Sequence, residues 1–283
     1  MSQSSWRSSP NPVKGEIAMR GAIVALLPAV RSTNEARDDK KRQSMTGYSV
    51  QERDVDVARD PDDTVSVSVT IDESAGAEHL LQRVMRFGHG RSRPRAAEQR
   101  DEIGYVVSGS GTLYLDAEPH PLEADMGFYV RAGERYEIEN EDDADIVVVS
   151  VTAPEPTGDV LEKRKVTVRV ADQPILPAGK DREFRFVINP DAGCKDVTQF
   201  VGMIPPGRAP THYHLYDEVI YVLDGEGVLH IDGRDDTPIR GGTCIYLPPP
   251  IQHCLENTGT RPLRVLGAFH PAGSASEAYE DTD

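Results

Sequence analysis

Cysteine is scarce in this chain, and long apolar runs are absent. The 283 residues include three cysteines, Cys194, Cys244 and Cys254. An odd and sparse set of this kind cannot build a disulfide framework and favours a reducing, cytoplasmic compartment. Every apolar stretch is shorter than the run of about 18 residues that a membrane-spanning helix needs. We therefore expect no transmembrane helix.

Basic residues are also few. Lys and Arg number 31 against 47 Asp and Glu, which gives a formal net charge of -16 at pH 7. A surface this acidic repels the phosphate backbone of nucleic acids and the anionic headgroups of membranes. We therefore expect neither of these partners.

The first 48 residues differ in composition from the rest. They open with the polar segment MSQSSWRSSPNP and hold eight basic and four acidic residues. We predict a disordered tail over residues 1–48, because a segment with so little apolar area cannot offset its ordering entropy. The apolar run Gly21–Val30 is short, and Glu16 in its upstream flank argues against a signal peptide. A start at Met45 is an alternative.

The remainder is typical of short β-strands. Stretches rich in Val, Ile and aromatic residues alternate apolar and polar positions and end at Gly, Pro, Asp or Asn. Examples are Val65–Ile71, Ile103–Val107, Ile146–Val151, Val166–Val170 and Arg264–Phe269. No convincing amphipathic helix is visible, although Ser274–Glu280 could form one helical turn. This pattern predicts an all-β fold of small barrels or jelly rolls.

An internal repeat divides the chain into two units. DEIGYVVSGSGTLYLD (Asp101–Asp116) aligns with DEVIYVLDGEGVLHID (Asp217–Asp232) at a constant offset of 116. Two copies of a unit of about 110 residues indicate two domains rather than a solenoid, which needs at least three short repeats. The segment Thr152–Asp159 contains Pro and Gly and suits an exposed linker. We therefore predict domains at residues 49–155 and 156–283.

Four potential metal ligands lie in the second copy. His212, His214 and Glu218 are separated by even numbers of residues, so on a strand their side chains share one face. His253 follows the proline run 248–250 and is expected on a neighbouring strand. Imidazole and carboxylate ligands suit one divalent transition metal ion: iron, manganese, zinc, nickel, copper or cobalt. Four protein ligands leave two octahedral positions open for water, oxygen or substrate, and an open position is typical of catalytic metals.

These residues lie in two motifs that resemble those of the cupin superfamily. Its first motif, G-x5-HxH-x3,4-E-x6-G, is similar to the segment from Gly207 to Gly225, and its second, G-x5-PxG-x2-H-x3-N, to Gly242–Asn257. This chain has one residue fewer between Gly207 and the first histidine, and it has Pro250 where the second motif has Gly. The resemblance implies a bicupin of two tandem jelly-roll barrels, with the metal ligands His212, His214, Glu218 and His253.

The first copy lacks this ligand set. By the offset, its residues at the four ligand positions are Ala96, Glu98, Glu102 and Tyr136, and only Glu102 matches its counterpart. Gly109, Gly133 and Asn140 remain at their motif positions. We therefore predict that the first domain keeps the fold without the metal.

The resemblance implies several reactions. A dioxygenase-type oxidoreductase acting on a small organic molecule is the leading expectation, because cupins such as quercetin dioxygenase use an open site of this kind. The alternatives are a metal-dependent hydrolase or isomerase, similar to the bicupin ureidoglycine aminohydrolase, and a non-catalytic metabolite-binding cupin. Oxalate decarboxylase is disfavoured, since that bicupin usually carries ligands in both halves. Cupin barrels commonly pair through sheet edges, so we expect either a homodimer or pairing of the two barrels within one chain.

Overall fold

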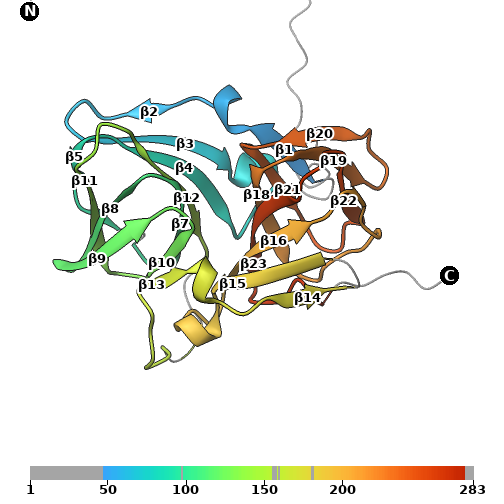
Figure 1. Ribbon diagram of the computed structural model, residues 1–283. Coiled ribbons are helices and arrows are strands. Elements are labelled where there is room, and N and C mark those ends of the chain that lie inside the picture. The colour runs from blue at the N-terminus through green and yellow to red at the C-terminus, as the bar shows by residue number, and fades with distance from the viewer. Residues whose placement is uncertain (1–46, 97, 155–157, 159, 180–181, 278–283) are drawn as a thin grey trace, which may run out of the picture.

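The computed structural model describes residues 47–96, 98–154, 158, 160–179 and 182–277, which form two tandem β-barrels (Figure 1). This confirms the predicted all-β fold class. The predicted disordered tail lies, up to residue 46, outside the described residues. Within the described ranges, no helix is long and apolar enough to cross a membrane. The helical segments there are short 3-10 turns: η1 (Glu52–Asp54), η2 (Glu73–Ala75), η3 (Val170–Asp172) and η4 (Pro190–Ala192).

The N-terminal barrel packs two sheets face to face. Its strands are β2 (Ala58–Arg59), β3 (Val65–Ile71), β4 (Leu81–Phe87), β5 (Gly90–Arg91), β6 (Arg95–Ala96), β7 (Glu102–Ser108), β8 (Ser110–Leu115), β9 (Glu118–Glu123), β10 (Met126–Val130), β11 (Arg135–Asn140), β12 (Ile146–Thr152) and β13 (Thr167–Arg169). The larger sheet has the order β13-β10-β7-β12-β4-β3-β2. The smaller has the order β5-β11-β8-β9, with β6 also paired to β11.

The C-terminal barrel repeats this plan. Its strands are β1 (Tyr48–Gln51), β14 (Leu176–Ala178), β15 (Arg182–Ile188), β16 (Thr198–Ile204), β17 (Gly207–Arg208), β18 (Asp217–Asp224), β19 (Glu226–Ile231), β20 (Thr237–Arg240), β21 (Thr243–Leu247), β22 (His253–Asn257) and β23 (Leu263–His270). The larger sheet has the order β1-β21-β18-β23-β16-β15-β14, and the smaller has the order β17-β22-β19-β20.

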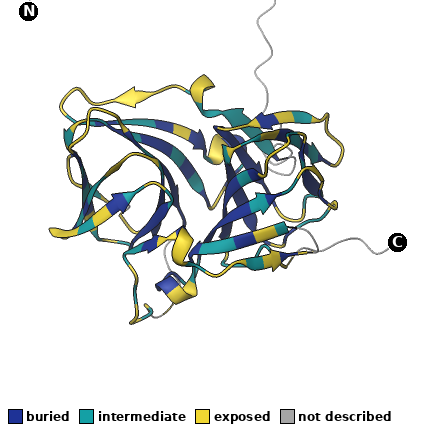
Figure 2. Cartoon of the chain, viewed as in Figure 1, coloured by how far each residue is buried: buried dark blue, intermediate teal, exposed yellow. Residues whose placement is uncertain are grey.

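The two larger sheets pack against each other, and their central strands, such as β7, β18 and β21, are buried on both faces (Figure 2). In β18, Val219 and Tyr221 lie in the hydrophobic cluster shared by the two barrels, whereas Ile220 and Val222 lie in the core of the C-terminal barrel. This alternation follows from the two-residue period of a strand. It also places Glu218 on the inner face of the barrel. The two barrels therefore pair within the chain, and a homodimer stays a prediction.

Each larger sheet takes one edge strand from beyond the predicted domain limits. β1 begins at Tyr48, the last residue of the predicted disordered tail, and continues into the predicted first domain, yet Tyr48 pairs with Tyr246 of β21 in the C-terminal barrel. The tail prediction is therefore wrong at Tyr48, because pairing with β21 orders it. β13 belongs to the second half of the sequence, yet Val168 pairs with Gly127 of β10 in the N-terminal barrel. The division near residue 155 separates the two copies of the repeat. It does not separate the two sheets, because each includes one edge strand from the other side of the division.

Equivalent glycines make one turn of the repeat in each barrel. Gly109 and Gly225 have φ angles of 87° and 98°, in the left-handed region that favours glycine. A Cβ atom added at Gly109 would lie 2.8 Å from the Cα of Ile146, and one at Gly225 would lie 3.0 Å from the Cα of Leu263. The SGSG and DGEG segments of the sequence repeat are therefore tight turns packed on a neighbouring strand.

Candidate metal centre

Both sheets of the C-terminal barrel and the segment before β18 bring the four sequence-predicted ligands together. The expectation that His212, His214 and Glu218 share one strand is wrong, because β18 begins only at Asp217, His212 lies in an isolated bridge and His214 lies in the loop between them. Glu218 is the second residue of β18, His253 is the first residue of β22, and both are buried. His212 and His253 form an isolated antiparallel bridge, with N–O distances of 3.0 and 2.9 Å between their main chains. This bridge fixes the two imidazoles side by side, and their ring centroids lie 4.6 Å apart.

The potential ligand atoms are close to one another. One ring nitrogen from each of His212, His214 and His253 lies within 4.8 Å of the other two. The Oε2 atom of Glu218 lies 3.8 Å from Nε2 of His214 and 3.7 Å from Nε2 of His253. The structure thus brings three imidazoles and one carboxylate to one point, and that they bind a metal stays a prediction.

The second nitrogen of each imidazole is held by the main chain. An Nδ1–H group can donate to a carbonyl oxygen in all three cases: from His212 to Pro210 at 3.0 Å, from His253 to Ile251 at 3.0 Å, and from His214 to Glu277 at 3.3 Å. Such outer contacts fix the tautomer and the ring orientation of metal-ligating histidines. They leave Nε2 as the ligating atom in each ring.

Burial shifts the pKa values of Glu218, His214 and His253 toward their neutral forms. It raises the pKa of Glu218 to about 8. Burial, with His212 nearby, lowers the pKa of His214 to about 4 and that of His253 to about 3. The Oε2 atom of Glu218 has no hydrogen-bond partner among the described residues. A buried carboxylate oxygen without a partner is costly, and a cation would satisfy it. The donor set therefore fits a divalent transition metal ion.

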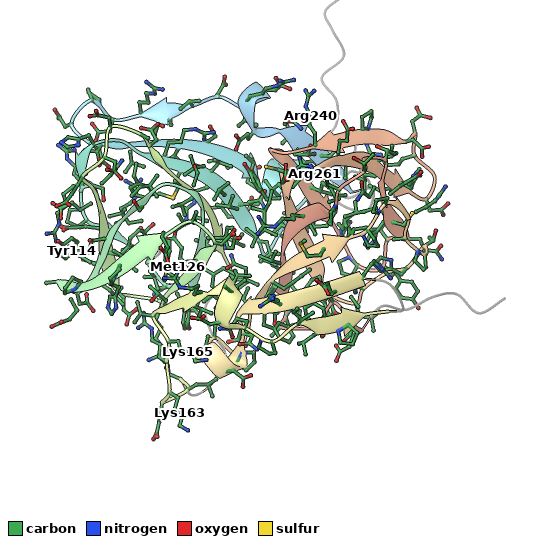
Figure 3. All side chains as sticks on the ribbon, viewed as in Figure 1. Tyr114, Met126, Lys163, Lys165, Arg240 and Arg261 are labelled. Atoms are coloured by element: carbon green, nitrogen blue, oxygen red, sulfur yellow. The ribbon has the colours of Figure 1, made fainter. Side chains whose placement is uncertain are left out.

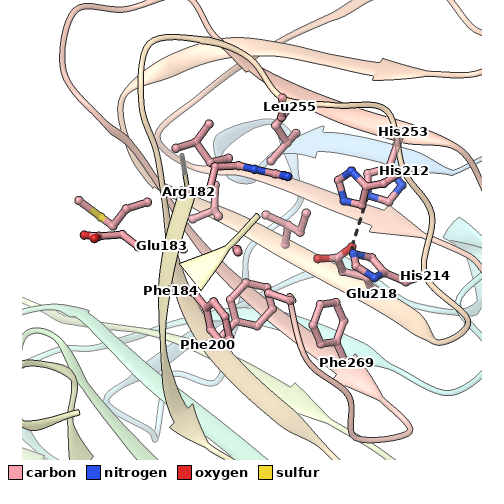
Figure 4. A pocket seen from close by; sticks show the side chains of 18 residues that line it. Arg182, Glu183, Phe184, Phe200, His212, His214, Glu218, His253, Leu255 and Phe269 are labelled. Atoms are coloured by element: carbon pink, nitrogen blue, oxygen red, sulfur yellow. Dashed lines mark ion pairs between the residues drawn. The ribbon is translucent and has the colours of Figure 1, made fainter. Parts of the chain in front are cut away.

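A mostly apolar cavity opens from the four ligands. Its volume is about 70 Å³. Its walls include three phenylalanines, Phe184, Phe200 and Phe269. Arg182, from β15, also lines the cavity, and Figure 4 shows its side chain extending toward the histidines. Its positive charge contributes to the lowered pKa of His214.

One site residue, Arg182, carried no recognisable signal in the sequence. Arg182 lies on a strand well before the first ligand, outside either motif, so no spacing rule connects it to the site. Locating it required the strand order of the larger sheet. Tyr216, by contrast, lies within the first motif between His214 and Glu218, and its ring stacks on His214 with centroids 5.1 Å apart.

In the first barrel, the glutamate equivalent to Glu218 is held by other side chains of the protein. Glu102 is buried and accepts a hydrogen bond from the hydroxyl of Tyr136 at 3.0 Å. The guanidinium of Arg83 lies 3.3 Å from the same carboxylate oxygen, which also accepts a hydrogen bond from Ser150. Burial, with Glu102 nearby, raises the pKa of Tyr136 well above its ordinary value, so the hydroxyl remains a donor.

Strand pairing corrects one equivalence taken from the constant offset. His212 pairs with His253, whereas in the first barrel the partner of Tyr136 is Arg95. Arg95 therefore occupies the position that the offset assigns to Ala96. The reason is one extra residue in the first copy before the repeat becomes regular at Asp101. The conclusion that this barrel lacks the three imidazoles is unchanged.

Comparison with known proteins identifies the family. The cupin domain matches twice, at residues 83–152 and 200–269. An oxalate-binding protein of Thermotoga maritima is 32% identical over 120 residues, which are 41% of this chain and 96% of that protein. An uncharacterised protein of Methanocaldococcus jannaschii, MJ1618, is 32% identical over 83 residues, which are 29% of this chain and 62%, less than two thirds, of that protein.

Solved structures agree in fold. Protein Ylba of E. coli has a TM-score of 0.67 at 12% identity, with 85% of this chain and 94% of that chain covered. Oxalate decarboxylase of Bacillus subtilis, studied for its Mn(II) centres, has a TM-score of 0.64 at 15% identity, with 90% and 88% covered. The two barrels and the site define a bicupin architecture. The chain belongs to the cupin family and carries two cupin domains.

Proposed function

We propose that this chain is a metal-dependent oxidoreductase whose substrate is a small carboxylate. The observation that supports this most directly is the pairing of one cationic side chain with four potential ligands across a small cavity. Arg182 lines the same 70 Å³ space as His212, His214, Glu218 and His253. A guanidinium recognises a carboxylate through two parallel hydrogen bonds, which a neutral pocket cannot offer.

The cavity limits the size of the substrate. A volume of about 70 Å³ between phenylalanine walls suits a molecule of a few heavy atoms rather than a polycyclic one. The relatives support this choice, since one is named an oxalate-binding protein and another is an oxalate decarboxylase. We therefore propose a short mono- or dicarboxylate as the substrate, with one carboxylate group held by Arg182.

The lining residues also bear on the reaction class. Besides the four ligands, the titratable side chains among the described lining residues are Arg182 and Glu183. Glu183 is exposed, so apart from the four ligands the described lining offers no buried side chain that would act as a general acid or base. A bound iron or manganese ion would supply a Lewis acid and one-electron chemistry with molecular oxygen. We therefore favour the dioxygenase-type reaction over the hydrolase or isomerase alternative.

A carboxylate-binding protein without turnover is the second candidate. It is favoured by the name of the Thermotoga maritima relative, of which this chain covers 96%. The apolar walls and Arg182 would serve binding equally well, since neither group performs chemistry. The two candidates differ in one measurable respect, because only an oxidoreductase consumes oxygen with the bound carboxylate.

The experiment combines metal analysis with turnover. The purified chain is expected to hold one divalent ion, read by mass spectrometry, and to consume oxygen with a member of a panel of small carboxylates that includes oxalate. Loss of the charge in Arg182→Gln should weaken carboxylate binding about 10- to 100-fold, the range for a hydrogen bond to a charged group. Arg240→Gln is the matched control, because Arg240 is exposed on β20 (Figure 3). A chain that binds no metal would refute the proposal.

A further inference from the structure

The segment after the last strand folds over the candidate metal centre. Residues 271–277 end in a turn closed by a 2.9 Å hydrogen bond from the amide of Glu277 to the carbonyl of Ser274. The hydroxyl of Tyr216 donates to the Ser274 carbonyl at 2.8 Å and to the Glu277 carbonyl at 3.4 Å. Gly273 packs flat on the same ring, since a Cβ atom there would lie 2.4 Å from it. One tyrosine therefore holds this segment in place.

The same tyrosine contacts a potential metal ligand. Its ring stacks on the imidazole of His214 with centroids 5.1 Å apart and planes 15° apart. Its other neighbour is Phe269, a cavity wall, at a centroid distance of 4.6 Å. The carbonyl of Glu277, which accepts from Tyr216, also lies 3.3 Å from Nδ1 of His214. Ligand, tyrosine and C-terminal segment thus form one contact network.

The segment also contributes to the wall of the cavity. Ala275 is one of its lining residues and packs against the hydrophobic cluster that contains Tyr216 and Phe269. Movement of residues 271–277 would therefore remove a wall of the cavity and the acceptor of the His214 Nδ1–H group together. The same movement would therefore open the cavity and free the imidazole of His214 to change its orientation.

We propose that Tyr216 is a positioning residue that clamps residues 271–277 over the metal centre, so that this segment fixes the orientation of His214 and limits the escape of the metal. The proposal rests on the metal site proposed above. It predicts a kinetic role: the clamp slows the release of the ion by holding one ligand and covering the cavity. Outer contacts to metal-ligating histidines commonly change metal affinity by 10- to 100-fold.

The test uses the full-length, metal-loaded protein. In Tyr216→Phe the ring still stacks on His214, but the hydroxyl that holds the segment is lost. Gly273→Ala leaves the barrel untouched and forces the segment away from the ring. Tyr221→Phe is the matched control, because its hydroxyl donates to Glu52 at 3.0 Å on the opposite face of β18. The readouts are the rate of metal loss to an excess of chelator and the visible spectrum of the cobalt(II)-substituted protein.

Both segment variants are expected to release metal about fivefold faster, the effect of losing one neutral hydrogen bond. Their cobalt(II) spectra should shift, while Tyr221→Phe keeps the wild-type rate and spectrum. Wild-type rates and spectra in both segment variants would overturn the proposal, even with metal bound. A wild-type protein that binds no metal would refute the proposed function instead. Thermal melting of each variant identifies misfolded protein, and Gly273→Ala still tests the clamp if Tyr216→Phe does not fold.

Discussion

The two barrels place a glutamate at matching positions of β7 and β18 and give it opposite surroundings. In the N-terminal barrel, Glu102 is met by Arg83, Tyr136 and Ser150. In the C-terminal barrel, an oxygen of Glu218 has no hydrogen-bond partner among the described residues and faces imidazoles at 3.7 and 3.8 Å. The comparison teaches that a buried carboxylate can be satisfied by protein donors or left for a cation.

The strand registers show which substitutions make the difference. Ser150 pairs with Arg83 in the first barrel, and at the same crossing in the second barrel Gly267 pairs with Phe200. Gly267 is required there, because a Cβ atom would lie 2.3 Å from the Phe200 ring. The second barrel thus replaces two polar partners of the carboxylate by an aromatic ring and the glycine that accommodates it. These replacements remove the internal donors and form the apolar wall of the cavity.

The largest expected effect converts the second site toward the first. His253→Tyr removes a ligand and introduces a hydroxyl where Tyr136 meets Glu102, so it could donate to Glu218. Because the loss of an outer contact alone costs about 10- to 100-fold in metal affinity, we expect a loss of more than about 100-fold here. Metal content and competition with a chelator measure it, with Tyr136→Phe as the control that changes no ligand. Stoichiometric metal in His253→Tyr would contradict the ligand assignment.

The converse experiment addresses the first barrel. Glu102→Ala leaves the partly buried charge of Arg83 without its carboxylate, and breaking such a pair is strongly destabilising. We expect the free energy of unfolding to fall by about 3 kcal/mol in denaturant titrations. Metal content should not change, because this barrel offers no imidazole at the matching positions. A halved metal content would show instead that the first barrel binds an ion.

The stability of the metal-free protein should depend on pH because the Glu218 carboxylate is buried. The folded pKa of Glu218, about 8, exceeds its unfolded value, so its contribution to stability is complete at low pH and is lost as the pH rises toward 8. His214 and His253 have folded pKa values of about 4 and 3, so their contribution is complete above about 6.5 and is lost in acid. Among these three residues, only Glu218 therefore changes its contribution to stability between pH 6.5 and 8.

We therefore expect the melting temperature of the metal-free protein to fall from pH 6.5 to pH 8, and Glu218→Gln to flatten that slope. Calorimetry in buffers of different ionisation enthalpy should also detect a proton released when metal binds at pH 7, since ligands must be deprotonated. Equal slopes in wild-type protein and Glu218→Gln would show that another group causes the pH dependence.

Much of this comparison could be predicted from the sequence. The spacing of His212, His214 and Glu218 predicted that they would meet, and the offset repeat predicted two barrels with one intact ligand set. The reason given by the spacing, one shared strand, was wrong, because His212 and His214 lie before β18 begins at Asp217. The strand β13 was predicted as Val166–Val170, whereas β1 was not predicted. The partners of both edge strands could not be assigned, because they are chosen by packing between the barrels. Arg182 was missed because its approach to the site depends on the strand order. The helical turn expected at Ser274–Glu280 is a single turn at 274–277, and its last three residues lie outside the described residues.

The smallest expected effect concerns a feature that both barrels keep. The hydroxyl of Tyr129 donates to Asp101 at 2.8 Å, and that of Tyr246 donates to Asp217 at 2.7 Å, at equivalent places in the repeat. A pair present in the barrel without imidazoles must serve the fold, although Asp217 directly precedes a candidate ligand. Tyr129→Phe and Tyr246→Phe should each cost about 1 kcal/mol of unfolding free energy, the usual value of one hydrogen bond. Metal affinity should stay unchanged in both, and a drop confined to Tyr246→Phe would mean that this pair positions Glu218.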